Sequence, residues 1–256
     1  IISKNNLHPS SETSFHALIN RKYVLHVHST ATIANAISQS SGFDLRKYLD
    51  EDFIFVPYCR PGFTLTMEIK KLILPSTNIL VLENHGLIVA GDDIEDTYKL
   101  LLKIHEKLDL IRNEKLGLDF LEKITNIGGY IHKNTDKYKL FSTQNEKLFS
   151  LFSKSFYPDH VIFLGPGIPT FSEENEANEF IQNLKRKNIN LPPYLIIKNK
   201  GLFENTLAIP AAKEMIDCFL EVLLRIDLSK SFKFLSSHQE SELLNWDIEI
   251  YRQSIN

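Results

Sequence analysis

This sequence of 256 residues has little cysteine, no long apolar run and no excess of charge of one sign. No run approaches the roughly 18 residues of a membrane span. The formal net charge of −3 argues against a surface built to bind a polyanion. Cys59 and Cys218 are far apart and belong to no metal or redox pattern, which fits a reducing compartment. No signal peptide is recognisable. We therefore expect a cytoplasmic protein with neither a membrane nor a nucleic-acid partner.

The stretch 23–28 predicts a β-strand with two histidines on one face. Strand side chains alternate, so His26 and His28 point to the same side. Two imidazoles placed in this way can share a metal ion, and a catalytic zinc site needs three protein ligands and one open position. His85, just after the apolar run 79–82, is the candidate third ligand. The alternative is that two histidines fall on a half-buried strand by chance.

Upstream of this strand, Glu12 is the candidate catalytic acid. Ser10 or Ser11 has the form of an N-cap, and a helix is predicted to run from there to about Asn20. A helix start suits an anion such as phosphate. The alternative is that Glu12 is only a first-turn acid that complements the helix dipole. Glu83, beside His85, is a second candidate acid, but strand alternation directs its side chain elsewhere.

Further elements follow from apolar patterns and turn residues. Continuous apolar runs predict strands at 53–56 and 79–82, and a strand at 87–91 follows a tight turn at Gly86. Helices are predicted at 64–72 and, after Asp92 or Asp93, over a long amphipathic segment. One stripe of that segment, expected to face the core, carries Ile94, Tyr98, Leu101, His105 and Leu108.

Together these motifs resemble the class II aldolase/adducin family in order and approximate spacing. The matching segments are Pro9–Glu12, Phe15–His16, His26–His28 and Asn84–Ile88. The resemblance implies an α/β fold of three layers, α/β/α, with a mainly antiparallel central sheet. It also implies a zinc ion (or another divalent metal) and a homo-oligomer. The roles that it implies are metal ligands for His26, His28 and His85, the acid/base for Glu12, and binding of the substrate phosphate for Ser10 and Ser11.

The resemblance implies a zinc-dependent lyase that cleaves a phosphorylated ketose by retro-aldol chemistry. A sugar-phosphate epimerase or dehydratase on the same metal site, and a non-catalytic adducin-like scaffold, stay open as alternatives. The sequence of residues 9–18 most resembles the aldolase domains of the rhamnulose-phosphate aldolase/alcohol dehydrogenase type. The chain has no Gly-X-Gly-X-X-Gly cofactor motif, and we expect an N-terminal segment of the family to be absent from the sequence.

The second half of the chain contains a similar pattern. Residues 196–202 align with 81–87, and each segment is followed by an amphipathic helix, here 209–226. A helix from 146 to about 156 and a strand at 160–164 are predicted to repeat the unit 12–28. The expected organisation is a metal-site domain at 1–112, a connector at 113–142 and a degenerate copy at 143–256. At the ligand positions this copy would have Phe163, Gly165 and Lys200. The alternative is chance similarity of short apolar strands.

Overall fold

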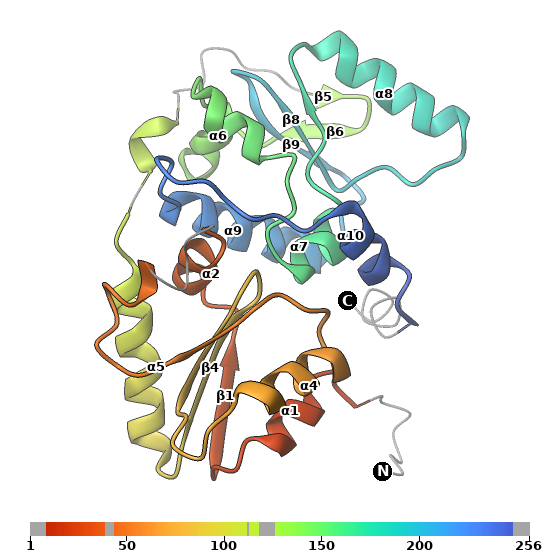
Figure 1. The fold of residues 1–256 in the computed structure, drawn as a ribbon. Helices are drawn as coiled ribbons and strands as arrows, with labels where there is room; N and C mark the ends of the chain where they lie inside the picture. Colours follow the sequence, from red (N-terminus) through yellow and green to blue (C-terminus); the bar gives the residue numbers. More distant parts are fainter. Residues whose placement is uncertain (1–8, 39–43, 112, 118–125, 248–256) are drawn as a thin grey trace. The chain divides into compact units, whose positions relative to one another are not determined.

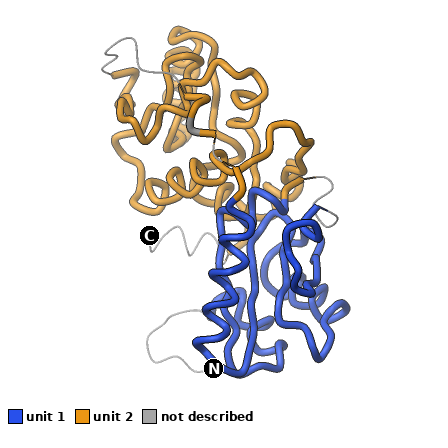
Figure 2. Tube along the Cα trace, turned by 90° about the vertical axis from the view of Figure 1, so that its left-hand side faces the viewer, with its two compact units in different colours: residues 1–36, 40–109 blue, residues 37–39, 110–256 orange. Residues whose placement is uncertain are grey.

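The computed structural model describes residues 9–38, 44–111, 113–117 and 126–247. The chain forms two compact units (Figure 1). Unit 1 comprises residues 1–36 and 40–109, and unit 2 comprises residues 37–39 and 110–256 (Figure 2). No helix in the described ranges is both long and apolar enough to cross a membrane.

The sheet of unit 1 has four strands in the order β1-β4-β3-β2. Strand β4 pairs antiparallel with β1 and β3, whereas β2 pairs parallel with β3. The sheet is therefore mainly antiparallel, as expected. The register places His26 opposite Ile88. The strand bounds are Tyr23–Val27 (β1), Ile54–Val56 (β2), Ile79–Leu82 (β3) and Gly86–Gly91 (β4).

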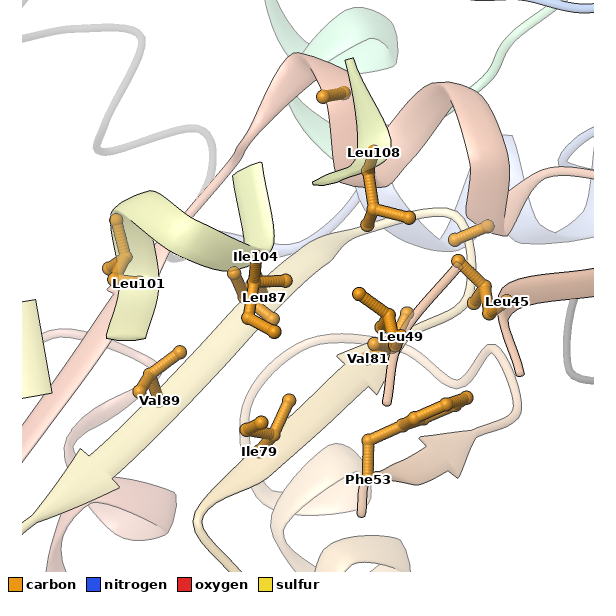
Figure 3. Packing of buried hydrophobic residues seen from close by; sticks show 12 residues of the cluster. Leu45, Leu49, Phe53, Ile79, Val81, Leu87, Val89, Leu101, Ile104 and Leu108 are labelled. Carbon is orange, nitrogen blue, oxygen red and sulfur yellow. The ribbon is translucent and has the colours of Figure 1, made fainter. Parts of the chain in front are cut away.

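Helices cover both faces of this sheet, so its central strands are apolar on both sides. Ile79 and Val81 of β3 pack with Leu101 and Ile104 of α5 (Figure 3), whereas Leu80 packs on the opposite face with residues of α1 and α4. Continuous apolar runs are typical of strands buried on both faces. The three-layer α/β/α arrangement is confirmed. The helices are α1 (Thr13–Leu18), α2 (Thr30–Ala36), α4 (Phe63–Leu72) and α5 (Ile94–Leu108).

Helix α5 begins as predicted but is turned about its axis relative to the predicted stripe. Its N-cap is Asp93, whose side chain accepts a hydrogen bond from the Asp96 backbone N–H. The buried side chains are Thr97, Leu101, Ile104 and Leu108. Ile94 and Tyr98, expected in the core, are exposed. The prediction was wrong for these two because the four buried positions already form a complete helical face.

Unit 2 contains a five-stranded sheet in the order β5-β6-β9-β8-β7. Strand β9 pairs antiparallel with β6 and β8, and β7 pairs parallel with β8. Two of its strands lie in the segment expected to be a connector, which therefore contributes to the sheet. The bounds are Asn126–Ile127 (β5), Tyr130–His132 (β6), Thr170–Phe171 (β7), Tyr194–Ile197 (β8) and Gly201–Asn205 (β9).

Residues 160–164, predicted as a strand, belong to a helix. Helix α7 has Pro158 at its first position and ends at Gly165, whose φ is +94°. Proline at a helix start and glycine just after its end are the expected boundaries. The continuous apolar run arises because every residue of α7 is buried. The remaining helices are α6 (Glu146–Leu151), α8 (Glu174–Arg186), α9 (Pro210–Arg225) and α10 (Ser237–Leu244), with 3-10 turns at Glu114–Leu116 and Asp136–Ser142.

His160 of α7 lies in this apolar core. Its ring centroid is 4.5 Å from that of Phe219, it is fully buried, and neither ring nitrogen has a hydrogen-bond partner among the described residues. Burial lowers the pKa of His160 to about 3, so the folded protein holds it neutral. The unfolded chain takes up this proton near pH 6.5. The contribution of His160 to stability is therefore complete above pH 6.5 and is lost as the pH falls towards 3.

Replacing His160 by leucine should raise the free energy of unfolding by about 1–3 kcal/mol at neutral pH, because two unpaired buried nitrogens are removed. The gain should be larger at pH 5, where the wild type also loses stability through proton uptake by the unfolded chain. Urea unfolding at pH 7 and pH 5 measures both effects. The exposed His238 of α10, replaced by leucine, is the matched control. An unchanged dependence on pH in His160→Leu would contradict this prediction.

Candidate metal centre

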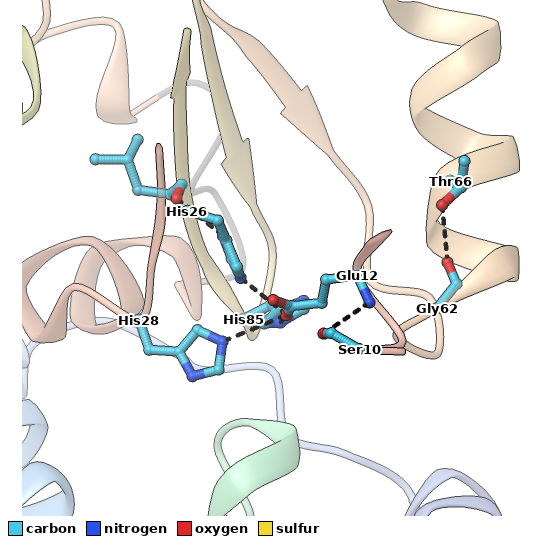
Figure 4. Close-up of polar contacts among 8 residues, drawn as sticks. Ser10, Glu12, His26, His28, Gly62, Thr66 and His85 are labelled. Atoms are coloured by element: carbon cyan, nitrogen blue, oxygen red, sulfur yellow. Dashed lines mark hydrogen bonds and ion pairs between the residues drawn. The ribbon is translucent and has the colours of Figure 1, made fainter. Parts of the chain in front are cut away.

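The three predicted histidines and Glu12 meet at one end of the unit 1 sheet (Figure 4). His26 is on β1, His28 follows that strand directly, and His85 lies in the turn between β3 and β4. Glu12 is the N-cap residue of α1. One ligand atom from each of the four residues can be chosen so that all lie within 4.8 Å of one another. In the part of the chain that the structure describes, this is the one such group of His, Cys, Asp and Glu side chains.

The turn that carries His85 depends on two unusual backbone positions. Asn84 has a φ of +53°, a left-handed conformation that asparagine tolerates better than most residues. The backbone N–H of His85 donates to the Leu82 carbonyl at 3.2 Å, which closes the turn. A Cβ atom on Gly86 would lie 2.5 Å from the Val27 carbonyl oxygen, so only glycine lets this turn approach the end of β1. The close approach brings His85 to His26 and His28.

Replacing Gly86 by alanine should force the end of β1 away from the start of β4, next to the candidate metal centre. The clash is with backbone, which cannot move aside as a side chain would, so we expect a loss of about 1–3 kcal/mol in the free energy of unfolding. We also expect weaker metal binding, because His85 would move away from His26. Chemical denaturation and metal titration of the variant measure the two effects. A stable variant with unchanged metal affinity would show that the approach is not required.

The carboxylate of Glu12 lies among the ring nitrogens. Its Oε1 atom is 3.1 Å from Nε2 of His26, 3.6 Å from Nε2 of His85 and 4.0 Å from Nε2 of His28. The side chains of His26 and His85 are almost fully buried, whereas those of His28 and Glu12 are 28% and 26% exposed. The cluster is therefore buried at His26 and His85 and partly exposed at Glu12 and His28.

The tautomer of His26 is fixed by its other nitrogen. Nδ1 is 3.0 Å from the Leu87 carbonyl oxygen, which can only accept, so Nδ1 carries the proton. In a neutral ring Nε2 then presents a lone pair to the Glu12 carboxylate, and both atoms are acceptors. A cation between them, either a proton or a metal ion, makes this arrangement favourable. Such a backbone hydrogen bond is the usual way in which a metal-binding histidine is oriented.

Electrostatics keep the donors of the cluster in the states that a metal requires. Burial alone would raise the pKa of Glu12, but the adjacent imidazoles of His26 and His85 outweigh burial and leave the pKa well below its usual range. Burial lowers the pKa of His85 to about 4, although the nearby Glu12 carboxylate opposes this. At neutral pH Glu12 is thus a carboxylate and His85 a neutral imidazole. Three imidazoles and one carboxylate form a donor set that suits zinc and similar divalent ions.

The two serines and Glu83 lie at the edge of this cluster. Ser10 is exposed and its Oγ accepts a hydrogen bond from the Glu12 backbone N–H, whereas Ser11 is half-buried. The N-cap of α1 is therefore Glu12, not one of the serines as predicted. The Glu83 carboxylate accepts a hydrogen bond from the Tyr58 backbone N–H at 3.0 Å. Glu83 thus fixes the loop after β2, and it is not part of the four-residue metal group.

Comparison with known proteins agrees with this geometry. The family model described as "Class II Aldolase and Adducin N-terminal domain" matches residues 1–110. These residues belong to the class II aldolase/adducin family. The matched segment includes all of unit 1 and thus all four residues of the candidate metal centre.

Two individual proteins are similar to part of this chain. An uncharacterized oxidoreductase, YuxG of Bacillus subtilis (strain 168), is 29% identical over 119 residues, which are 46% of this chain and 17% of YuxG. The N-terminal class II aldolase domain of a conserved protein from Thermoplasma acidophilum is 28% identical, with a TM-score of 0.39, over 41% of this chain and 49% of that domain. The chain thus spans less than a fifth of YuxG and about half of the archaeal domain.

Proposed function

We propose that this chain is a divalent-metal-dependent lyase of the class II aldolase type that cleaves a phosphorylated ketose. The observation that carries the proposal is the convergence of three imidazole Nε2 atoms on the Glu12 carboxylate, within a domain of this family. The ligands would be His26, His28 and His85, with zinc as the metal that best fits their chemistry. A bound divalent ion would act as a Lewis acid that polarises the substrate carbonyl and stabilises developing negative charge.

Glu12 is the residue placed to move a proton in this reaction. Its carboxylate is partly exposed beside His28, so it can reach a bound substrate, accept a proton from it and return that proton. In retro-aldol cleavage a hydroxyl proton is removed, the carbon–carbon bond breaks, and its electron pair moves towards the carbonyl oxygen. This leaves an enediolate. When its carbonyl re-forms, the α-carbon takes up a proton, which balances the proton removed from the hydroxyl. We assign this protonation to Glu12, with the buried His26 and His85 excluding water behind it.

The substrate phosphate is proposed to bind near Ser10 and Ser11. The exposed Ser10 hydroxyl accepts a hydrogen bond from the Glu12 backbone N–H, and Ser11 lies between Ser10 and Glu12 in the sequence. Hydroxyl and backbone N–H groups are typical ligands of phosphate oxygens. A homo-oligomer, which the family resemblance implies, is part of the same proposal and is measured by light scattering.

The test combines metal analysis with a substrate panel. Protein purified without chelator is expected to contain about one zinc or similar ion per chain. Incubation with ketose phosphates, followed by detection of the released aldehyde, is expected to show cleavage that chelator abolishes and metal restores. The same panel is analysed for epimerised and dehydrated products, which would assign the site to one of those reactions instead. Stoichiometric metal without turnover of any sugar phosphate would contradict the proposed lyase.

A further inference from the structure

The two units have the same strand order and strand directions. In unit 1, β2 runs parallel to β3, and β4 and β1 follow antiparallel; in unit 2, β7, β8, β9 and β6 are arranged in the same way. A helix joins the two parallel strands in each unit, α4 in one and α8 in the other. A long helix follows the final strand, α5 or α9. Strand β5 is an addition to this shared pattern.

The correspondence extends to single residues. Gly86 pairs with Leu82 and Gly201 with Ile197, so the two hairpins align at their glycines. The residue two before each glycine is an asparagine with positive φ, +53° at Asn84 and +61° at Asn199. The residue before each asparagine makes the same backbone hydrogen bond to the neighbouring parallel strand. The backbone N–H of Glu83 donates to Val56 and that of Lys198 to Phe171, both at 2.9 Å.

This alignment identifies the unit 2 residues at the ligand positions. His26 pairs with Ile88, two residues after Gly86, and His132 pairs with Phe203, two residues after Gly201. His132 therefore corresponds to His26, and Asn134 to His28. Lys200 precedes its glycine as His85 does. The sequence comparison was right for Lys200 but wrong for Phe163 and Gly165, because residues 158–164 form helix α7.

A lysine–glutamate pair lies at this place in unit 2. The Lys200 ammonium is 2.5 Å from the Glu174 carboxylate, and the two side chains are 30% and 37% exposed. The ring of His132 lies against the same turn, with Nε2 2.7 Å from the Lys200 carbonyl oxygen. Lys200 thus carries a positive charge at the position that corresponds to His85. Its partner Glu174 comes from α8, the counterpart of α4, whereas Glu12 of unit 1 precedes α1.

We propose that unit 2 is a second copy of the unit 1 fold in which the Lys200 ammonium, paired with Glu174, has taken the place of the metal ion. The metal position is taken from the centre proposed for unit 1. An ammonium tethered to the turn supplies a fixed positive charge without any ligand from solution, so unit 2 keeps its turn closed without metal. Unit 2 consequently retains the backbone positions of the former metal ligands, which we call the frame, and His132 is still present at one of them.

The frame can be tested by rebuilding the ligand set in the full chain with N134H/K200H. Together with His132 and Glu174 this gives three imidazoles and one carboxylate. The natural chain should bind about one zinc and the variant about two, by elemental analysis after desalting. Hydrogen exchange measured by mass spectrometry locates the ions. At zinc concentrations near 100 times Kd, exchange should slow about 100-fold in peptides covering 82–88 of both proteins, and in 197–203 of the variant alone.

The control adds His132→Phe to the rebuilt variant, which should remove the second zinc. A folded N134H/K200H chain that binds no second zinc would overturn the proposal. So would slower exchange at 197–203 in the natural chain on adding zinc, a result that does not depend on how the variant folds. Lys200→Met alone should speed exchange at 197–203, and Glu174→Gln should add little to it. A second zinc in unit 2 without one in unit 1 would contradict the proposed function but not this inference.

Discussion

Replacing His85 by alanine is expected to abolish stoichiometric metal binding and nearly all lyase activity. His85 is buried and neutral at physiological pH, and its Nε2 lies 3.6 Å from Glu12 Oε1. Two imidazoles cannot supply the three protein ligands of a catalytic zinc site. Loss of a residue that merely orients a ligand costs about 10–100-fold in metal affinity, and loss of a ligand itself should cost more. Elemental analysis and aldehyde release, compared with the wild type, measure the two effects.

His16→Ala is the matched control for this variant. His16 is a half-buried histidine on α1 that stacks on Phe15, and it is not part of the metal group. Its replacement should leave the metal content at about one ion per chain. If both variants lost metal equally, the loss in His85→Ala would reflect disturbed packing and not a missing ligand. If His85→Ala kept its metal, the three-histidine centre would be wrong.

Replacing Glu12 by glutamine should separate proton transfer from metal binding. Glutamine has nearly the same size but cannot ionise, so it cannot take up and return a proton. General acid–base catalysis contributes about 10²–10⁴-fold, and we expect kcat to fall by an amount in this range. The three imidazoles remain, so the protein should still bind metal, although more weakly. Steady-state kinetics on the cleaved ketose phosphate and metal titration measure the two effects separately.

Glu83→Gln provides the comparison for Glu12→Gln. The amide oxygen of glutamine can still accept the hydrogen bond from the Tyr58 backbone N–H, so the loop after β2 should be retained. Its kcat should remain within a few-fold of the wild type, on the order of a surface substitution. A large fall in kcat for Glu83→Gln with little change for Glu12→Gln would exchange the roles of the two glutamates.

The parts of the fold that could be predicted are those with strong local signals. Strand β3 was located from its continuous apolar run, and α5 from its acidic cap and 3.6-residue period. Helix α7 was missed because a fully buried helix and a buried strand both appear as a short apolar run. Pro158 and Gly165, at the two ends of the run, are the signals that distinguish this helix from a strand. The exposure of Ile94 and Tyr98 depends on how α5 packs, which the sequence of one helix does not determine.

The candidate site was predictable as a set of residues but not as a geometry. Strand alternation placed His26 and His28 on one face, and the turn at Gly86 indicated a special backbone near His85. The hydrogen bond from His26 to the Leu87 carbonyl depends on the pairing register of β1 with β4, which is a tertiary property. The sequence gives no signal for His132, because its strand, β6, has only three residues. Its register against β9, and not its sequence, relates it to His26.

The division of the chain between the units has a consequence for the order of folding during synthesis. Residues 37–39 belong to unit 2, where Ser38 forms a β-bridge with Phe232 and the Ile37 carbonyl accepts from the Lys233 backbone N–H. Contacts over such a separation, about 200 residues, are slow to form because a long loop must close. Unit 1 can complete its sheet once β4 has left the ribosome. Unit 2 must wait until Phe232 and Lys233 have been made, so residues 37–39 meet their partners long after they themselves have left the ribosome.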